Sequence, residues 1–437
     1  MKKILVLLLS LLVLTACGSK ASGGAQTEAD MAKAERVLEG TIQIYAPKGK
    51  NSDYLTKSME LYNQKYSANL KLDLVDVAAA IPMVQKITPM LVSDEKMPEL
   101  VFMQDSVAGS IFEKFEDRFY SAEAFGFVGE HGSKFYPAKM NMLKNIAPSK
   151  QTFGFPNDWG NAAMFYNDAA FKEAGVNMEE VKTWDQFIEA GKKLNAATGK
   201  KLMYMRDTGE VDMINYLTEQ QEVSMFDEAG NLNLLNDAVI KAYDVVNQIQ
   251  EADLAAYGPS NDYIKIGQET GVILQGGWLA SMQSKDFLDD SGNWRVAKLP
   301  QMIEGKDVAP MSGGSSYYVT KNSENATAAY QFITFALTDL DALQAYMGFM
   351  GLPANMDAYE TEAAKKQFEY YGNQSILEEL NEISKTSVNG YVYPYSTDLA
   401  NYIQQASYDI QYNGADVKTA LEKQANDFAQ KYGIKVN

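Results

Sequence analysis

Thr41-Ile42-Gln43-Ile44-Tyr45 opens the stretch that decides the fold, and Leu100-Val101-Phe102-Met103 closes it. Apolar residues alternate in the first segment and again over residues 70–74, as in half-buried strands. Between these strands a helical spacing recurs at Leu55, Met59, Tyr62 and Tyr66. A less regular helix, interrupted by Pro89, is expected over about residues 82–92. The order strand, helix, strand, helix, strand predicts a parallel sheet with right-handed crossovers.

Upstream of this sheet, residues 1–16 have the pattern of an export signal. Lys2 and Lys3 precede an apolar run, Ile4 to Leu14, that is broken only by Ser10. The run is shorter than the roughly 20 residues that span a bilayer, and small residues follow it. The string Leu14-Thr15-Ala16-Cys17-Gly18 resembles a bacterial lipobox. That resemblance implies cleavage before Cys17, a diacylglycerol on its sulfur, and a protein anchored at the extracellular face of the cell membrane. The alternatives are a plain secreted protein and an uncleaved signal anchor.

Residues 17–39 are mostly small and polar, which predicts a flexible tether between the anchor and a folded part that begins near Gly40. Roughly 400 residues remain, more than one hydrophobic core normally serves, so we expect two domains. Cys17 is the only cysteine, which excludes a disulfide within one molecule. We find no second apolar segment of membrane-spanning length, and we expect the folded part to lie outside the membrane.

The formal charge is −18, and loss of Lys2 and Lys3 with the signal lowers it to −20. Such an acidic balance argues against nucleic acid and against electrostatic adhesion to anionic lipid. The clearest later helix begins at Thr183, where Gln186 completes a capping box. Its expected buried face is formed by Phe187, Ala190, Gly191 and Leu194.

Four short motifs follow one another after Phe153: Phe155-Pro156, Phe165-Tyr166-Asn167, Phe171-Lys172-Glu173-Ala174-Gly175 and Thr183-Trp184-Asp185-Gln186-Phe187. Four more follow downstream, at residues 271–278, 296–300, 313–316 and 351–354. In this order they resemble the extracellular solute-binding proteins of ABC importers, specifically the carbohydrate-binding group that includes the maltodextrin-binding proteins. The resemblance covers about residues 40–437.

The resemblance implies an α/β, two-lobed, periplasmic-binding-protein-like (Venus flytrap) fold with discontinuous lobes. Residues 40–152 plus 300–349 would form the N-terminal lobe, and residues 153–299 plus 350–437 the C-terminal lobe. The chain would cross between them near Phe153–Pro156, Lys298–Gln301 and Phe349–Pro353. It further implies a monomer that binds a sugar or short oligosaccharide in the interlobe cleft and delivers it to ABC permease subunits.

A sugar cleft needs aromatic rings to cover CH faces and polar groups to pair hydroxyls. We expect Trp159 and Trp278 to be the rings, whereas Trp184 and Trp294 should pack in the core. The expected polar partners are Gln104, Asp105, Asp158, Asp207, Gly314 and Ser315. Tyr45 and Tyr395 are expected to line the cleft from the two lobes. For each residue the alternative is a core, turn or capping role.

Two departures from the family pattern leave the sugar open. Residues 46–50 read Ala-Pro-Lys-Gly-Lys, where many relatives have a tryptophan-containing stretch. The late aromatic site is matched only approximately, by Tyr393 and Tyr395. The sequence does not identify the sugar, its chain length, the affinity or the permease, and a non-sugar solute such as a phosphate ester stays open as well.

An enzymatic function finds little support in the sequence. His131 is the only histidine, so a catalytic triad and a His/Cys metal site are not expected. No phosphate-binding loop motif is present, and we expect no cofactor. A cell-surface glycoside hydrolase needs only two carboxylates, which 57 acidic residues could supply. That enzyme and a glycan-binding adhesin lipoprotein are therefore the alternatives to a transport protein.

Overall fold

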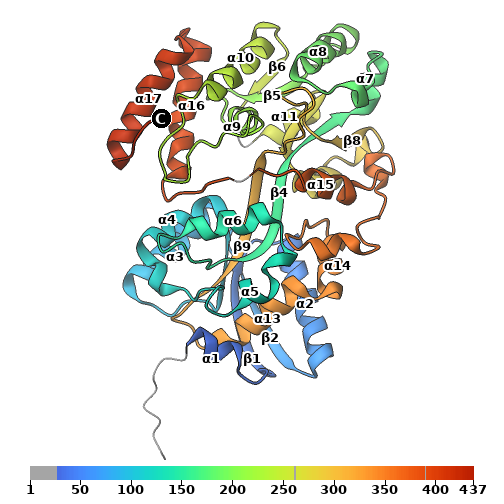
Figure 1. Cartoon of the computed structure of the whole chain (residues 1–437). Helices are drawn as coiled ribbons and strands as arrows, with labels where there is room; N and C mark the ends of the chain where they lie inside the picture. The colour runs from blue at the N-terminus through green and yellow to red at the C-terminus, as the bar shows by residue number, and fades with distance from the viewer. Residues whose placement is uncertain (1–26, 260–261, 389) are drawn as a thin grey trace, which may run out of the picture.

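The structure is a computed structural model that describes residues 27–259, 262–388 and 390–437 (Figure 1). The predicted export signal and Cys17 lie outside the described residues. The first part of the chain forms β1 (Glu39–Ala46), α2 (Lys50–Tyr66), β2 (Asn69–Asp76), α3 (Ile81–Ser93) and β3 (Leu100–Gln104). Strand β1 pairs in parallel with both β2 and β3. The predicted strand and helix order is thus confirmed, with Pro89 inside α3.

The other α-helices and strands are, in chain order, α1 (Glu28–Ala32), α4 (Asp105–Phe115), α5 (Phe127–His131), α6 (Pro137–Ile146), β4 (Phe155–Asn167), α7 (Asp168–Glu173), α8 (Trp184–Thr198), β5 (Met203–Arg206), α9 (Asp212–Glu219), α10 (Asp237–Glu251), β6 (Ala255–Gly258), α11 (Tyr263–Gln268), β7 (Val272–Gly276), α12 (Leu279–Asp286), β8 (Trp294–Ala297), β9 (Met311–Val319), α13 (Ala326–Thr338), α14 (Leu340–Gly348), α15 (Ile376–Ser384), α16 (Ser396–Asn413) and α17 (Val417–Tyr432).

Two lobes are joined by the long central strands β4 and β9 (Figure 1). The strand order is β2-β1-β3-β9-β4-β7-β5-β6, and β8 pairs with β4. The first half of β4 pairs with β9, and its second half pairs with β7. Helices α13 and α14 return the chain to the lobe of β1 and β2, whereas α16 and α17 lie on the lobe of β5 and β6 (Figure 1). Both lobes are therefore built from discontinuous segments, as predicted.

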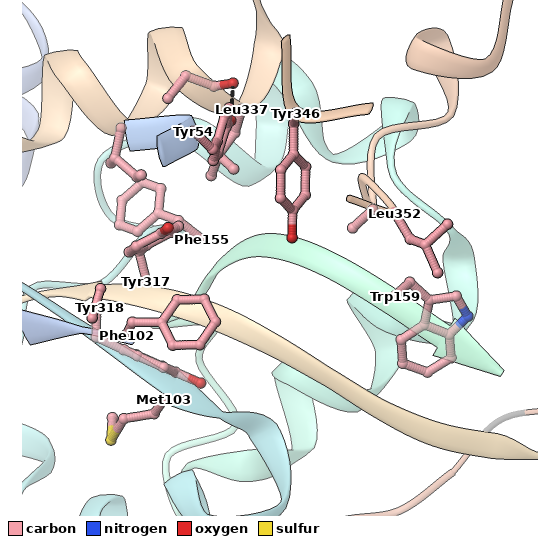
Figure 2. Close-up of a cluster of buried hydrophobic side chains, with 14 of the residues drawn as sticks. Tyr54, Phe102, Met103, Phe155, Trp159, Tyr317, Tyr318, Leu337, Tyr346 and Leu352 are labelled. Carbon is pink, nitrogen blue, oxygen red and sulfur yellow. Dashed lines mark hydrogen bonds between the residues drawn. The ribbon is translucent and has the colours of Figure 1, made fainter. Parts of the chain in front are cut away.

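Each lobe has apolar residues at the spacing that its elements require. In the second lobe, α8 has the predicted capping box between Thr183 and Gln186. Its predicted face, Phe187, Ala190, Gly191 and Leu194, is buried. In the first lobe, Tyr54 on α2 stacks on Tyr346 of α14 with ring centroids 4.4 Å apart. Figure 2 shows these rings beside Tyr317, with Trp159 next to Leu352.

The predicted tether is shorter than the sequence indicated, because part of it folds. Thr27 caps the short helix α1, and Met31 within that helix is buried against the first lobe. The Arg36 guanidinium lies 3.7 Å from the centroid of the Tyr66 ring, and the Val37 amide donates to Gln331 Oε1. Burial of one methionine and these polar contacts order a segment whose composition alone favours flexibility.

A buried ion pair connects α6 to the central strands. The Lys139 ammonium contacts Asp105 Oδ2 and donates to the Ser315 carbonyl at 3.0 Å. The Ser316 hydroxyl donates to Asp105 Oδ1 at 2.8 Å. Burial raises the pKa of Asp105, and Lys139 and Ser316 oppose that rise. A carboxylate in this position depends on its cation, because desolvated charge is costly unless it is paired and hydrogen-bonded.

We expect Lys139→Met to lower the free energy of unfolding by about 3–5 kcal/mol, because it leaves Asp105 buried without its cation. Urea unfolding of the full protein measures the change. Lys57→Met is the matched control, since Lys57 pairs with Glu60 at 2.8 Å on an exposed surface and should change stability by about 1 kcal/mol or less. Equal losses in the two variants would contradict the assigned role of the buried pair.

Candidate ligand-binding cleft

Six of the predicted site residues line one hollow between the lobes. This tryptophan chamber has a volume of about 210 Å³. The predicted residues on its wall are Gln104, Asp158, Trp159, Trp278, Gly314 and Ser315. They come from the end of β3, the first half of β4, the residues after β7, and β9. The site therefore lies at strand ends and bends, where open α/β sheets commonly place ligands.

Asp158 is held in place by three donors. Its Oδ1 accepts from the Ser315 amide at 2.7 Å and from the Ser315 hydroxyl at 2.6 Å. Its Oδ2 accepts from the Tyr346 hydroxyl at 3.1 Å. Each carboxylate oxygen can accept about two hydrogen bonds, so Oδ2 retains capacity for a donor from a ligand.

The two tryptophans of this chamber have different surroundings. Trp159 is only 1% exposed, and its Nε1 donates to the Ser387 hydroxyl at 2.9 Å. Trp278 is partly exposed. Trp159 therefore forms a fixed part of the wall, and Trp278 offers the more accessible ring. The other two tryptophans, Trp184 and Trp294, are buried in the core as predicted.

Lys50 is a chamber residue that the sequence did not identify. It opens α2 directly after β1 and lies on the wall of the tryptophan chamber. Burial lowers the pKa of Lys50, and the nearby Asp158 carboxylate opposes that effect. The available signal was the departure from the family pattern at Ala46-Pro47-Lys48-Gly49-Lys50, which has polar groups where many relatives have a tryptophan-containing stretch.

A larger second hollow of about 530 Å³ adjoins the first and shares Gln104, Trp278 and Gly313 with it. We call it the α9 chamber, because one face of α9 forms much of its wall. That face consists of Asp212, Asn215, Tyr216 and Glu219, spaced as one helical stripe. The opposite residues Met213, Ile214 and Leu217 are buried in the core of the second lobe.

The sequence analysis did not identify this stripe, because a polar face of a helix is usually exposed to solvent. Its period was nevertheless visible, and a tyrosine between acidic and amide residues was the one signal of a binding surface.

Arg206 in the α9 chamber is already matched by carboxylates. Its Nη2 lies 2.5 Å from Asp212 Oδ2, and its backbone amide donates to Glu210 Oε2. Burial raises the pKa of Glu210, and the neighbouring Asp212 charge raises it further. Beside this group the Tyr216 hydroxyl shares a 2.6 Å hydrogen bond with Ser312 Oγ on β9.

Glu219 differs from Asp212, the other carboxylate on this wall, because its carboxylate is buried without a cation. The residue is 9% exposed, and its Oε2 accepts from the Met311 amide at 2.7 Å. Within the described residues no Lys or Arg pairs with this carboxylate, and no other hydrogen bond to its two oxygens is present. Burial raises the pKa of Glu219 to about 7.

The remaining four predicted residues lie outside both chambers. Tyr45 is buried, with its ring 5.8 Å from Lys86 Nζ. Asp105 is paired with Lys139 beneath β9. Asp207 is exposed on a turn after β5. Tyr395 stacks on Tyr393 and donates to the Gly230 carbonyl, while Tyr391 and Ser396 beside it do line the α9 chamber.

Among the described residues, no group of three His, Cys, Asp or Glu side chains is arranged to hold a metal ion. In the same part of the chain, no helix combines the length and apolarity needed to cross a membrane.

We expect Glu219 to make stability depend on pH. Its pKa is about 7 in the folded state against an ordinary 4.5, so between these values the folded protein retains a proton that the unfolded chain has released. The free energy of unfolding should therefore fall as pH rises through this window. Glu219→Gln should remove up to about 3 kcal/mol of that fall between pH 5 and 8.

Urea unfolding at several pH values measures the effect of Glu219→Gln. Glu189→Gln, which removes an exposed carboxylate of α8 paired with Lys192, is the control and should keep the wild-type slope. An unchanged slope in Glu219→Gln would show that this carboxyl is not the titrating group.

Comparison with known proteins identifies the family to which the chain is similar. Residues 103–340 match the family described as bacterial extracellular solute-binding protein. A lactose-binding protein of Rhizobium radiobacter is 27% identical over 349 residues, which cover 77% of this chain and 80% of the relative. An arabinooligosaccharide-binding protein of Bacillus subtilis is 23% identical over 376 residues, covering 84% and 83%.

Solved structures show the same fold. The binding protein associated with an ABC transporter of B. animalis subsp. lactis, solved with beta-1,6-galactobiose, has a TM-score of 0.71 at 21% identity and covers 92% of this chain and 100% of its own. The galacto-N-biose-/lacto-N-biose I-binding protein of Bifidobacterium longum has a TM-score of 0.72 at 19% identity, with the same coverage. These likenesses confirm the predicted two-lobed α/β fold. Since the family match covers more than half of the chain, this protein belongs to the bacterial extracellular solute-binding proteins.

Proposed function

We propose that the protein captures a short oligosaccharide between its lobes and delivers it to the permease of an ABC importer. The observation that carries this proposal is the pair of chambers that meet at Trp278. An accessible ring at the junction, with polar groups on both sides, suits a ligand of at least two sugar units. The named relatives, which bind lactose and arabinooligosaccharides, support this ligand class.

In this proposal the six predicted residues of the tryptophan chamber contact the sugar. Trp278 covers a CH face, Asp158 Oδ2 accepts from a hydroxyl, and the Gln104 amide can donate or accept. Gly314 has no side chain that would project from this wall of the chamber. Its φ is +135°, and a Cβ there would lie 2.8 Å from Asp105 Oδ2. A side chain at that position would be strained and would displace the buried ion pair.

The proposed transport cycle is a hinge motion between lobes of residues 40–152 plus 300–349 and residues 153–299 plus 350–437. The open protein binds sugar on one lobe, and the other lobe closes over it. Ligand drives closure only through its tighter affinity for the closed form. The permease then meets surfaces of both lobes. No covalent chemistry is involved, so the sugar is released unchanged.

We further propose that the protein works as a monomer at the extracellular face of the cell membrane, held there by lipid on Cys17. Lipobox-like residues 14–18 support the anchor, and more than one acyl chain would make it durable. Mass spectrometry of the mature N-terminal peptide tests this: a diacylglycerol-modified Cys17 supports the anchor, and an unmodified cysteine refutes it.

The ligand class is tested by thermal unfolding of the protein against mono- and oligosaccharides, amino acids and phosphate esters. Ligand at 100 times its Kd should add about 2.7 kcal/mol to the free energy of unfolding, a shift of several degrees. A shift confined to amino acids or phosphate esters would overturn the carbohydrate assignment.

We expect Trp278→Ala to weaken binding of the stabilising sugar by more than about tenfold, because the variant loses both the stacking contact and the apolar area that the ring covers, together more than about 1.4 kcal/mol. Isothermal titration measures the affinity, and the melting temperature without ligand checks the fold. Trp278→Phe keeps an aromatic face and should retain most of the affinity. If Trp278→Ala binds as tightly as wild type, Trp278 is not part of the site.

A further inference from the structure

We infer that the α9 chamber selects its ligand by charge, accepting uncharged sugar units and rejecting units that carry a carboxylate, and that Glu219 is the residue that sets this preference. The inference rests on the proposed function, because it concerns the sugar unit that would occupy this chamber. It goes further by naming the class of sugar that the protein excludes.

The charged groups that line the α9 chamber are unequal in number. Among the described lining residues, Arg206 is the only cation, whereas Asp212 and Glu219 are anions. Arg206 is bound to Asp212, and Glu210 lies directly behind the pair. The positive charge of Arg206 is therefore already compensated by Asp212, and the chamber offers no surplus positive charge to an acidic ligand.

Glu219 has no compensating charge on its other side either. A hollow behind it is lined by the acidic residues Glu222, Asp227, Glu228 and Asp307, and no Lys or Arg is among the described residues of that wall. Lys306 and Lys298 pair with Glu222 and Asp307 from outside the hollow, and neither lysine pairs with Glu219. The Met311 amide fixes Oε2 from β9. Oε1 has no donor within the described chain and can accept a hydroxyl from an uncharged sugar.

A carboxylate on the ligand would be repelled by the Glu219 carboxylate. Inside a closed chamber the effective dielectric constant is low, so repulsion between two carboxylates is stronger than in water. To relieve that repulsion Glu219 would have to take up a proton, because its pKa of about 7 makes it the first of the two carboxylates to be protonated. The tryptophan chamber differs, because Lys50 and Asp158 balance each other on its wall. Rejection of acidic units is therefore a property of the α9 chamber.

The test uses matched pairs of disaccharides that differ only by carboxylates: α-1,4-galactobiose with digalacturonate, and lactose with lactose oxidised at C6 of its galactose. Isothermal titration at pH 8, where Glu219 is ionised, gives the affinities. We expect the acidic member of a bound pair to bind at least about tenfold more weakly than the neutral one, because protonating Glu219 one pH unit above its pKa of about 7 costs about that factor. Glu219→Gln should narrow that ratio at least about fivefold.

Glu222→Gln is the control, because this exposed carboxylate pairs with Lys306 outside the α9 chamber; its ratio should equal that of wild type. Equal affinities within a pair, or an unchanged ratio in Glu219→Gln, would overturn the inference while sugar binding itself stands. If neither these pairs nor any oligosaccharide of the thermal panel binds, the proposed function fails and the inference fails with it.

Discussion

The register of β9 between β3 and β4 is the constraint on which the site depends. Ser315 lies opposite both Gln104 on β3 and Asp158 on β4, and Gly314 lies opposite Trp159. Side chains alternate between the faces of a strand, so a slip of one residue would turn these groups away from the cleft. The Lys139 ammonium stabilises this register, because it binds both Asp105 and the Ser315 carbonyl. The same strand contributes Ser312 and the Met311 amide to the α9 chamber.

Charge is treated differently in three parts of the molecule. Asp105 and Lys139 neutralise each other under the sheet, where they stabilise the strands and face no ligand. Asp158 and Lys50 both line the tryptophan chamber, where hydrogen bonds fix the carboxylate. Glu219 alone is buried with a single backbone donor. An unbalanced buried charge is costly, and such groups gather at functional sites more than elsewhere. In our proposal Asp105 therefore stabilises the fold, Asp158 contacts the ligand and Glu219 determines which ligands are excluded.

Much of this arrangement could be predicted from the sequence, for reasons that also explain the failures. Strand burial follows directly from the alternation at Ile42 and Ile44 and from the apolar run that begins at Leu100. The first strands of the sheet were therefore predictable from the local sequence pattern. Trp278 was predicted from its family motif, and Asp158 from its expected place in a loop near the cleft. Asp105 was predicted to accept from a sugar hydroxyl, but in the structure it pairs with Lys139. Lys139 lies 34 residues away in the chain and becomes a neighbour only when α4 and α6 pack. The face of α9 was missed because a helix stripe of polar residues has the same pattern whether it faces water or a cavity.

The account requires that one sugar chain touch both lobes at once. Crystallographic determination of the complex with the most strongly stabilising oligosaccharide measures this directly. The account predicts one sugar unit stacked on Trp278, with hydroxyls on Asp158 in the tryptophan chamber and on the face of α9 in the other. A ligand bound outside these chambers, or held by one lobe alone in a closed molecule, would contradict it.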